Sequence, residues 1–180
     1  MRGMYILRGH WDNDEATGAG VNDRLDLIIE NELIDHGTSD DYYTPPTVFE
    51  ALNVQFDLDV AGPPGGVPWI PAIKTLTVVD DGLVTPWVGK VWCNPPFSNI
   101  PPWIKKMREH GNGIALVGIS KSAWCNEAWK LADGVMLLPS NLKFVRASGN
   151  PESILTATML LGFGADNVEA MRQSNLGFVR

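Results

Sequence analysis

Residues 94–97, Asn94, Pro95, Pro96 and Phe97, suit the chemistry of an aromatic amine. An exocyclic amine such as that of adenine is a poor nucleophile, because its lone pair is delocalised into the ring. Acceptors at both of its N–H groups would favour a pyramidal nitrogen and direct the lone pair at an electrophilic methyl group. The side-chain oxygen of Asn94 and the backbone carbonyl of Pro95 can be these acceptors. The two prolines hold the loop rigid, and Phe97 offers a flat face for stacking a base.

A simple proline-rich turn that closes a strand is the alternative interpretation of this loop. Its position directly after Val91-Trp92-Cys93, a predicted strand, favours the catalytic interpretation. A second candidate is Asp57-Leu58-Asp59-Val60-Ala61-Gly62, in which a strand ends in an acid followed by small residues. Such an end can hold a nucleoside or amino-acid cofactor, although an acid beside an ordinary turn would look the same. The stretch lacks the glycine-rich fingerprint of dinucleotide sites, so a nicotinamide cofactor is not expected.

Hydrophobic periodicity predicts an α/β protein with a mostly parallel sheet. Thr44 is expected to cap a helix that begins at Pro45-Pro46. In parallel sheets ligands bind at the carboxyl ends of the strands, where both candidate motifs fall. Further expected elements are strands at 56–60, 75–79, 90–93, 114–119, 135–138 and 154–161, a loop at 61–74, and helices at 101–109, closed by Gly111, and 122–132.

Length and composition indicate one globular domain. The chain has 180 residues, 44% hydrophobic and 19% charged, enough for a single core. We expect an acidic N-terminal extension at 1–40, partly disordered with one helix at 25–34, and a catalytic domain at 41–180. No stretch is long enough to span a membrane and no signal peptide is evident, so a cytoplasmic location is expected. Cys93 and Cys125 have no nearby metal-ligand partners, which predicts reduced thiols and no metal site.

Charge is unevenly distributed along this acidic chain. The net charge is −7 overall, which does not by itself suit a polyanionic partner. Residues 1–60 carry 13 acids and 3 bases, whereas residues 90–146 carry 8 bases and 3 acids. This asymmetry allows a basic face on an acidic protein. Lys121, Lys143 and Arg146 are candidates for phosphate contacts, with ordinary surface charge as the alternative.

Several motifs together resemble the phage-type DNA N6-adenine methyltransferase (Dam-like) family. They lie between about residues 40 and 163, and their order and spacing make the resemblance specific. The motifs are Asp41-Tyr42-Tyr43-Thr44-Pro45-Pro46-Thr47-Val48-Phe49, Phe56-Asp57-Leu58-Asp59-Val60-Ala61, Asp80-Asp81-Gly82-Leu83 with Trp87, Val91-Trp92-Cys93-Asn94-Pro95-Pro96-Phe97-Ser98-Asn99, and Asn141-Leu142-Lys143-Phe144.

The resemblance implies a class I methyltransferase fold, a Rossmann-like sandwich, with S-adenosylmethionine as the methyl donor and DNA as the partner. It implies that residues 94–97 receive a flipped adenine and that Asp59 binds the methionine end of the cofactor. A phage or prophage origin is also implied, and protection of phage DNA by restriction-modification is one role left open. The remaining cofactor contacts that it implies are Tyr43, Thr44, Pro45, Ala61, Gly62 and Asp81.

Two departures from larger methyltransferases stand out. A Gly/Pro-rich loop replaces the helix expected after Asp59, so the cofactor pocket is open or completed by a second copy in a homo-oligomer. No target-recognition domain is evident, so a short or loose recognition sequence is expected.

Trp103 is a candidate to flank the site, and 146–151 is expected to be a flexible loop that closes over DNA. Three alternatives to DNA adenine methylation stay open. They are methylation of an RNA base, methylation of a protein glutamine amide, and nucleic-acid binding without turnover.

Overall fold

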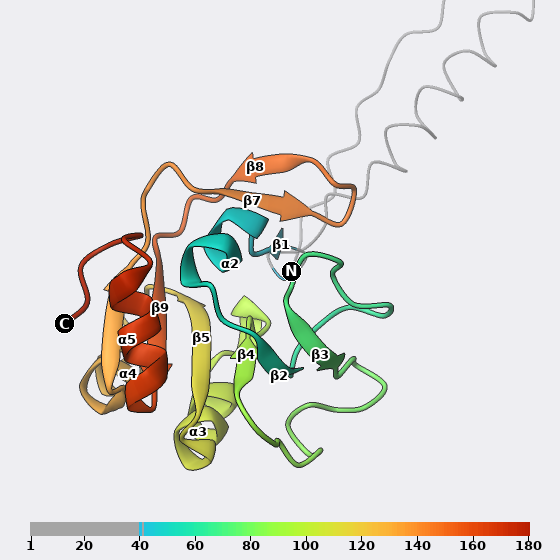
Figure 1. Ribbon diagram of the computed structural model, residues 1–180, viewed down its shortest axis with the longest axis horizontal. Helices are drawn as coiled ribbons and strands as arrows, with labels where there is room; N and C mark the ends of the chain where they lie inside the picture. The colour runs from blue at the N-terminus through green and yellow to red at the C-terminus, as the bar shows by residue number, and fades with distance from the viewer. Residues whose placement is uncertain (1–39, 41) are drawn as a thin grey trace, which may run out of the picture. The chain divides into compact units, whose positions relative to one another are not determined.

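A computed structural model describes residue 40 and residues 42–180, which form an α/β sandwich (Figure 1). The α/β class predicted from the sequence is confirmed. The strands are β1 (Tyr42–Tyr43), β2 (Phe56–Asp59), β3 (Ala72–Thr75), β4 (Val91–Cys93), β5 (Gly113–Gly118), β6 (Gly134–Leu137), β7 (Lys143–Arg146), β8 (Pro151–Ser153) and β9 (Thr158–Phe163). The helices are α2 (Pro46–Leu52), α3 (Pro101–His110), α4 (Ala123–Leu131) and α5 (Ala165–Gln173), with a 3₁₀ turn, η1 (Phe97–Asn99).

The main sheet has six strands in the order β3-β2-β4-β5-β9-β6. The pairs β3–β2, β2–β4 and β4–β5 are parallel, whereas β9 is antiparallel to both β5 and β6. The sheet is therefore mixed, with one reversed strand set into an otherwise parallel arrangement. Strands β2, β4 and β5 consequently bring their carboxyl ends to one edge of the sheet, where a ligand is expected to bind.

Helices cover both faces of this sheet, and each face has its own hydrophobic core. Helices α3 and α4 pack on one face, with Met107 and Cys125 among their buried residues. Helices α2 and α5 pack on the other face, with Phe49 and Met171 buried. All six residues of β5 and of β9 are buried, because strands covered on both sides have no solvent face.

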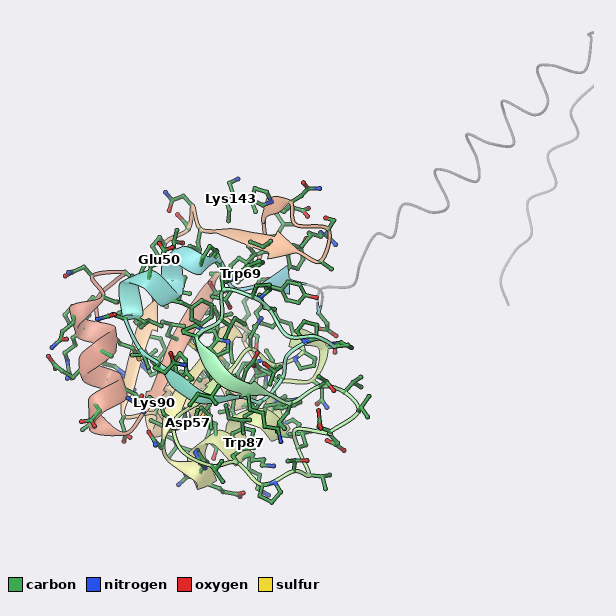
Figure 2. The ribbon with its side chains drawn as sticks, turned by 45° about the vertical axis from the view of Figure 1, so that its right-hand side comes forward. Glu50, Asp57, Trp69, Trp87, Lys90 and Lys143 are labelled. Carbon is green, nitrogen blue, oxygen red and sulfur yellow. The ribbon has the colours of Figure 1, made fainter. Side chains whose placement is uncertain are left out.

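A second, smaller sheet covers the carboxyl edge of the main one. It has three antiparallel strands in the order β1-β7-β8. In Figure 2, Lys143 of β7 lies at the opposite end of the molecule from Asp57 and Lys90. Those two residues mark the amino ends of β2 and β4, where the Lys90 backbone N–H donates to Asp57 Oδ2 at 2.6 Å. The smaller sheet therefore sits over the edge where the candidate motifs end.

Several predicted elements are in different places in the structure. Strand β3 spans residues 72–75 and not 75–79, so the predicted loop ends three residues early. Strand β9 begins at Thr158, whereas a strand was expected over 154–161. The loop predicted at 146–151 is the turn of the β7–β8 hairpin, in which Val145 pairs with Pro151. Strands β3 and β8 are short edge strands, whose apolar pattern is weak. Strand β9 is a buried interior strand, and only its start differs from the prediction.

The two ends of the described chain also differ from expectation. Pro45, and not Thr44, is the N-cap residue of α2, and no side-chain cap hydrogen bond is present. The Thr44 side chain is buried, and its hydroxyl has no hydrogen-bond partner within the described residues. Helix α5 was not predicted at all. By contrast α3 begins at the predicted Pro101-Pro102 and ends at Gly111, whose φ of 72° suits glycine. The extension predicted at 1–40 lies outside the described residues except for Asp40.

Candidate active site

Two neighbouring cavities meet at the loop that follows β4. The larger, about 600 Å³, opens beside the carboxyl ends of β2 and β4. The smaller, about 350 Å³, lies between the same loop and the β7–β8 hairpin. Both volumes are in the range of small-ligand sites. Asp40, Tyr42 and Asn94 line both cavities. The two ligands of a transfer reaction could thus meet at Asn94.

The larger cavity contains most of the residues predicted to bind a cofactor. Tyr43, Ala61, Gly62 and Asp81 all line it. Asp81 has a left-handed backbone, with φ of 49°, and its Oδ1 accepts a hydrogen bond from the Leu83 N–H at 3.1 Å. Its carboxylate is thus held within a tight turn at the cavity wall. The other lining residues are Val60, Pro63, Pro64, Thr77, Val78, Gly82, Pro96 and Trp103, together with the three shared ones.

Asp59 precedes the lining residues Val60, Ala61 and Gly62 but does not itself line this cavity, and it is only 1% exposed. Its Oδ1 accepts a hydrogen bond from the Ala61 N–H at 3.3 Å, whereas Oδ2 has no partner among the described residues. Burial raises the pKa of this carboxyl to about 7, because a charge in an apolar setting loses its hydration. A buried carboxylate oxygen without a partner is costly unless a ligand donates to it. Asp59 Oδ2 is therefore a candidate acceptor for a cation or a hydroxyl group of a ligand.

Gly62, which lines the larger cavity, packs closely against Asp59. A Cβ atom added at Gly62 would lie 2.8 Å from Asp59 Oδ2 and 2.3 Å from the methyl group of Thr75. Any side chain here would therefore collide with both residues. The glycine predicted from the Asp59–Gly62 pattern is thus required by a close approach at the floor of the cavity.

Asn94 is held in one orientation by β1. Its Nδ2 donates a hydrogen bond to the Tyr42 backbone carbonyl at 3.0 Å. Since this bond occupies the amide nitrogen, the side-chain oxygen is left as an acceptor for the cavities. The neighbouring Pro95 lines the smaller cavity, whereas Pro96 lines the larger one. The four loop residues therefore form the wall between the cavities. The sequence analysis expected all four to receive the adenine, but Pro96 lines the larger cavity and not the smaller one that contains Pro95 and Phe97.

Phe97 forms part of the wall of the smaller cavity and packs against the end of β5. A Cβ atom added at Gly118 would lie 3.2 Å from the Phe97 ring and 3.0 Å from the Thr156 methyl group. Gly118 thus allows the ring to lie flat against the strand end. Asp40 also fixes this loop, because its Oδ1 accepts from the Ser98 N–H at 3.0 Å and its Oδ2 from the Ser98 hydroxyl at 2.6 Å.

A charged cluster on the smaller sheet closes the other side of the smaller cavity. The Arg146 guanidinium lies 4.4 Å from the centre of the Tyr42 ring, and its Nη2 donates to the Tyr42 hydroxyl at 2.6 Å. Its Nε donates to Glu152 Oε2 at 2.5 Å, and this hydrogen bond holds the pKa of Glu152 below its usual range. Arg146 is therefore held in the wall of the smaller cavity through both its Nε and its Nη2.

The remaining predicted residues are more distant from the cavities. Thr44 and Pro45 are buried and line neither cavity; the Thr44 carbonyl accepts instead from the Trp69 indole at 2.8 Å. Lys143 lines neither cavity, but its Nζ donates at 2.5 Å to Ser153, which lines the smaller one. Lys121 is exposed in the turn after β5 and lines neither cavity. The structure thus brings only Arg146 of the three basic candidates to a cavity.

The sequence did not identify the part of the smaller cavity that comes from β8 and the segment after it. These residues were not candidates: Glu152, Ser153, Ile154, Leu155 and Thr156. Tyr42 and Phe144, which also line it, stood inside the recognised motifs without a role. Their place in those motifs was the signal that could have identified them.

Other kinds of site find no support in the described part of the chain. No cluster of three or more His, Cys, Asp or Glu residues that could hold a metal ion occurs among residues 40 and 42–180. Both cysteines are buried free thiols, and burial raises the pKa of Cys93 well above its usual range. Within the same described residues, no helix is long and apolar enough to cross a membrane.

The α/β sheet carries two adjoining cavities of ligand size, one on each side of an Asn-Pro-Pro-Phe loop, and this arrangement suits the transfer of a group between two ligands. The family model described as DNA N-6-adenine-methyltransferase (Dam) matches residues 33–160. The chain belongs to this family, and the resemblance predicted from its motifs is confirmed. Membership supports adenine-N6 methylation of DNA as the general activity. A comparison with curated proteins gave no match.

Proposed function

We propose that this protein transfers a methyl group from S-adenosylmethionine to the exocyclic amine of an adenine flipped out of DNA. The observation that carries the proposal is that Asn94 lies on the wall shared by two cavities of ligand size. The larger cavity would hold the methyl donor and the smaller one the base. A transfer between two ligands requires this kind of meeting point.

The larger cavity suits the donor by its chemistry. S-adenosylmethionine carries an ammonium group and ribose hydroxyls, and the unpartnered Asp59 Oδ2 beneath the floor can accept from either of them. Asp81, held in its turn at the cavity wall, offers a second carboxylate. Tyr43, Ala61 and Gly62 would shape the cavity, and Thr44 and Pro45 would support it from behind. When bound, the donor supplies a methyl group made electrophilic by the sulfonium charge.

The smaller cavity suits a single flipped base. Phe97, Tyr42 and Phe144 contribute aromatic surface to its wall, and stacking on such rings contributes about 1–3 kcal/mol per base. The Asn94 side-chain oxygen and the Pro95 carbonyl would each accept one hydrogen bond from the exocyclic amine. These bonds would direct the nitrogen lone pair out of the ring plane and toward the larger cavity. The amine would lose its extra proton to water after transfer, so no base is required before attack.

The fold and location follow from the same proposal. We infer a class I methyltransferase sandwich, supported by the parallel strands β3, β2, β4 and β5, whose carboxyl ends adjoin the cavities. Residues 1–40 would be an acidic extension to a catalytic domain at 41–180. A phage origin, which the motif resemblance implies, would place the protein's action in the cytoplasm of the host cell. Lys121 and Lys143 would contact phosphates beyond the cavity rim.

Methyl transfer from labelled S-adenosylmethionine to unmethylated DNA tests this function. After digestion, the label is expected in the N6-methyl deoxyadenosine fraction. RNA and a glutamine-containing protein are offered in parallel under the same conditions. Label in RNA or protein but not in DNA would contradict the assigned acceptor. Cofactor binding with no transfer to any acceptor would indicate a binding protein without turnover.

A further inference from the structure

Leu155 is a fully exposed leucine at the rim of the smaller cavity. Its relative exposure is 106%, yet it is among the residues that line the cavity. Such a side chain contributes nothing to the core, and single exposed leucines are common on protein surfaces. What distinguishes Leu155 is its place, because it lines the same cavity as Asn94.

The backbone around Leu155 is fixed on both sides. Ile154 packs against the core of the α2–α5 face. Two residues further on, the Ala157 carbonyl accepts a hydrogen bond from the Ile119 N–H at 2.8 Å. The Thr156 methyl group lies close to Gly118 at the end of β5. Because its neighbours are anchored, Leu155 is presented outward by a short, held segment.

Basic side chains accompany this exposed leucine. Segment 154–157 directly follows strand β8, which pairs with β7. Lys143 and Arg146 of β7 both bond to β8, at Ser153 and Glu152 respectively. An apolar projection beside cations suits a nucleic acid, whose phosphates attract the cations while its base stack accepts an apolar group.

Flipping a base leaves a hole in the duplex. Unpairing and unstacking the target costs free energy, and proteins that distort DNA often insert Leu, Ile, Phe or Met side chains between base steps. A side chain that does so next to the receiving cavity would hold the vacated space open while the base occupies the cavity. Leu155 is the exposed apolar residue among those lining the smaller cavity.

We propose that Leu155 is a positioning residue that inserts into the duplex where the adenine is removed. This inference rests on the proposed function and deepens it, because it defines the preferred acceptor as paired DNA. Leu155 would not touch the reacting atoms. Its contribution would be confined to substrates whose target base must first be unstacked and unpaired.

Comparing double-stranded with heat-denatured DNA of the same sequence tests this role. For Leu155→Ala, kcat/KM on duplex DNA is expected to fall by about tenfold or more, since flipping costs a few kcal/mol. On denatured DNA it should stay within about twofold of wild type. Leu137→Ala is the matched control, because Leu137 is 50% exposed and lines neither cavity. It should behave as wild type on both substrates.

A second measurement does not depend on turnover. With 2-aminopurine at the methylated position of a duplex, wild-type protein should increase its fluorescence, and Leu155→Ala should give a smaller increase. Unchanged duplex activity, or equal losses on duplex and denatured DNA, would overturn the insertion role while the wild-type activity stands. A wild-type protein inactive on both DNA forms would overturn the proposed function, and the insertion role with it.

Discussion

The side-chain amide of Asn94 donates to the backbone carbonyl of Tyr42, 52 residues earlier in the chain. This bond links the loop after β4 to β1, and β1 pairs in turn with β7. The smaller sheet and the loop at residues 94–97 are thereby joined directly. Because the bond uses the amide nitrogen, the orientation of the Asn94 oxygen depends on the small sheet being in place.

Replacing Asn94 with Ala should nearly abolish transfer while leaving cofactor binding largely intact. Loss of one positioned hydrogen-bonding group typically lowers kcat by about 10²–10³-fold. Asn126→Ala, on the exposed face of α4, is the control and should be fully active. Rates from labelled transfer and affinities from calorimetry would measure both effects. Equal loss of transfer and cofactor binding would contradict the assignment of Asn94 to the acceptor.

Cofactor affinity should depend on the ionisation of Asp59. Its pKa is raised to about 7, so below that pH the carboxyl is increasingly protonated and attracts a cation less. Affinity for S-adenosylmethionine is therefore expected to rise as the pH increases toward 7, by at most about tenfold per pH unit. Asp59→Asn should bind weakly and lose this dependence. Calorimetric titrations across this range are the measurement, and a wild-type affinity that does not change with pH would contradict the role.

Stability without cofactor should show the opposite trend with pH. The folded pKa of Asp59 is raised from 3.8 to about 7, so between these values the folded state binds the proton more tightly than the unfolded state. The free energy of unfolding should therefore fall as the pH rises from about 4 to 7, by at most about 4 kcal/mol. Urea unfolding of wild type and Asp59→Asn across this range would show it. The free energy of unfolding should fall less steeply with pH in Asp59→Asn than in wild type. An identical pH dependence in both proteins would refute the prediction.

Enlarging Gly118 should displace Phe97 and weaken base binding. A Cβ atom there would lie 3.2 Å from the ring, so Gly118→Ala requires a small shift and Gly118→Leu a large one. Misplacing a positioned group by about 1 Å can lower kcat/KM about 10²-fold. We expect graded losses for DNA, with cofactor affinity unchanged in both variants. Similar activity in the two variants would argue against the contact.

Lys106 should stabilise the loop that carries Asp81. Its Nζ donates to the carbonyls of Gly82, Leu83 and Thr85 at 3.0, 2.8 and 2.7 Å. Lys106→Met keeps the length of the side chain but removes the donors, and should lower the free energy of unfolding by about 2–3 kcal/mol. Lys105→Met is the control, because that side chain is 78% exposed. Thermal melting of both variants would show whether the loss is specific to position 106.

The elements with a strong apolar pattern were predictable from the sequence. Strands β2, β4, β5 and β6 and helices α3 and α4 lie within a few residues of their predicted positions. They are buried on one or both faces, so apolar residues recur along them in a pattern that reflects the burial. The edge strand β3 exposes Ile73 and Lys74 and has no such pattern. Strands β1, β7 and β8 contain Tyr, Lys, Arg, Pro and Glu, and they exist through pairing with distant partners.

Some residues of the candidate site were likewise predictable from the sequence, and others were not. Asn94, Pro95 and Phe97 were recognisable because their chemistry is local to one loop, and Tyr43, Ala61, Gly62 and Asp81 because they lie in recognised motifs. Glu152 and Leu155 were not, because their place beside Asn94 depends on the hairpin that folds back over the sheet. No local property of residues 151–156 indicates that they meet a loop more than fifty positions away.

The pairing of β1 with β7 also determines when the site can be completed during synthesis. Every residue that lines the larger cavity lies between Asp40 and Trp103, whereas the smaller cavity requires residues up to Thr156. The hydrogen bond from Arg146 to the Tyr42 hydroxyl joins residues 104 positions apart, and contacts of such separation form slowly. A nascent chain therefore acquires the groups proposed to hold the methyl donor well before those proposed to hold the base, and the smaller cavity is the last part to assemble.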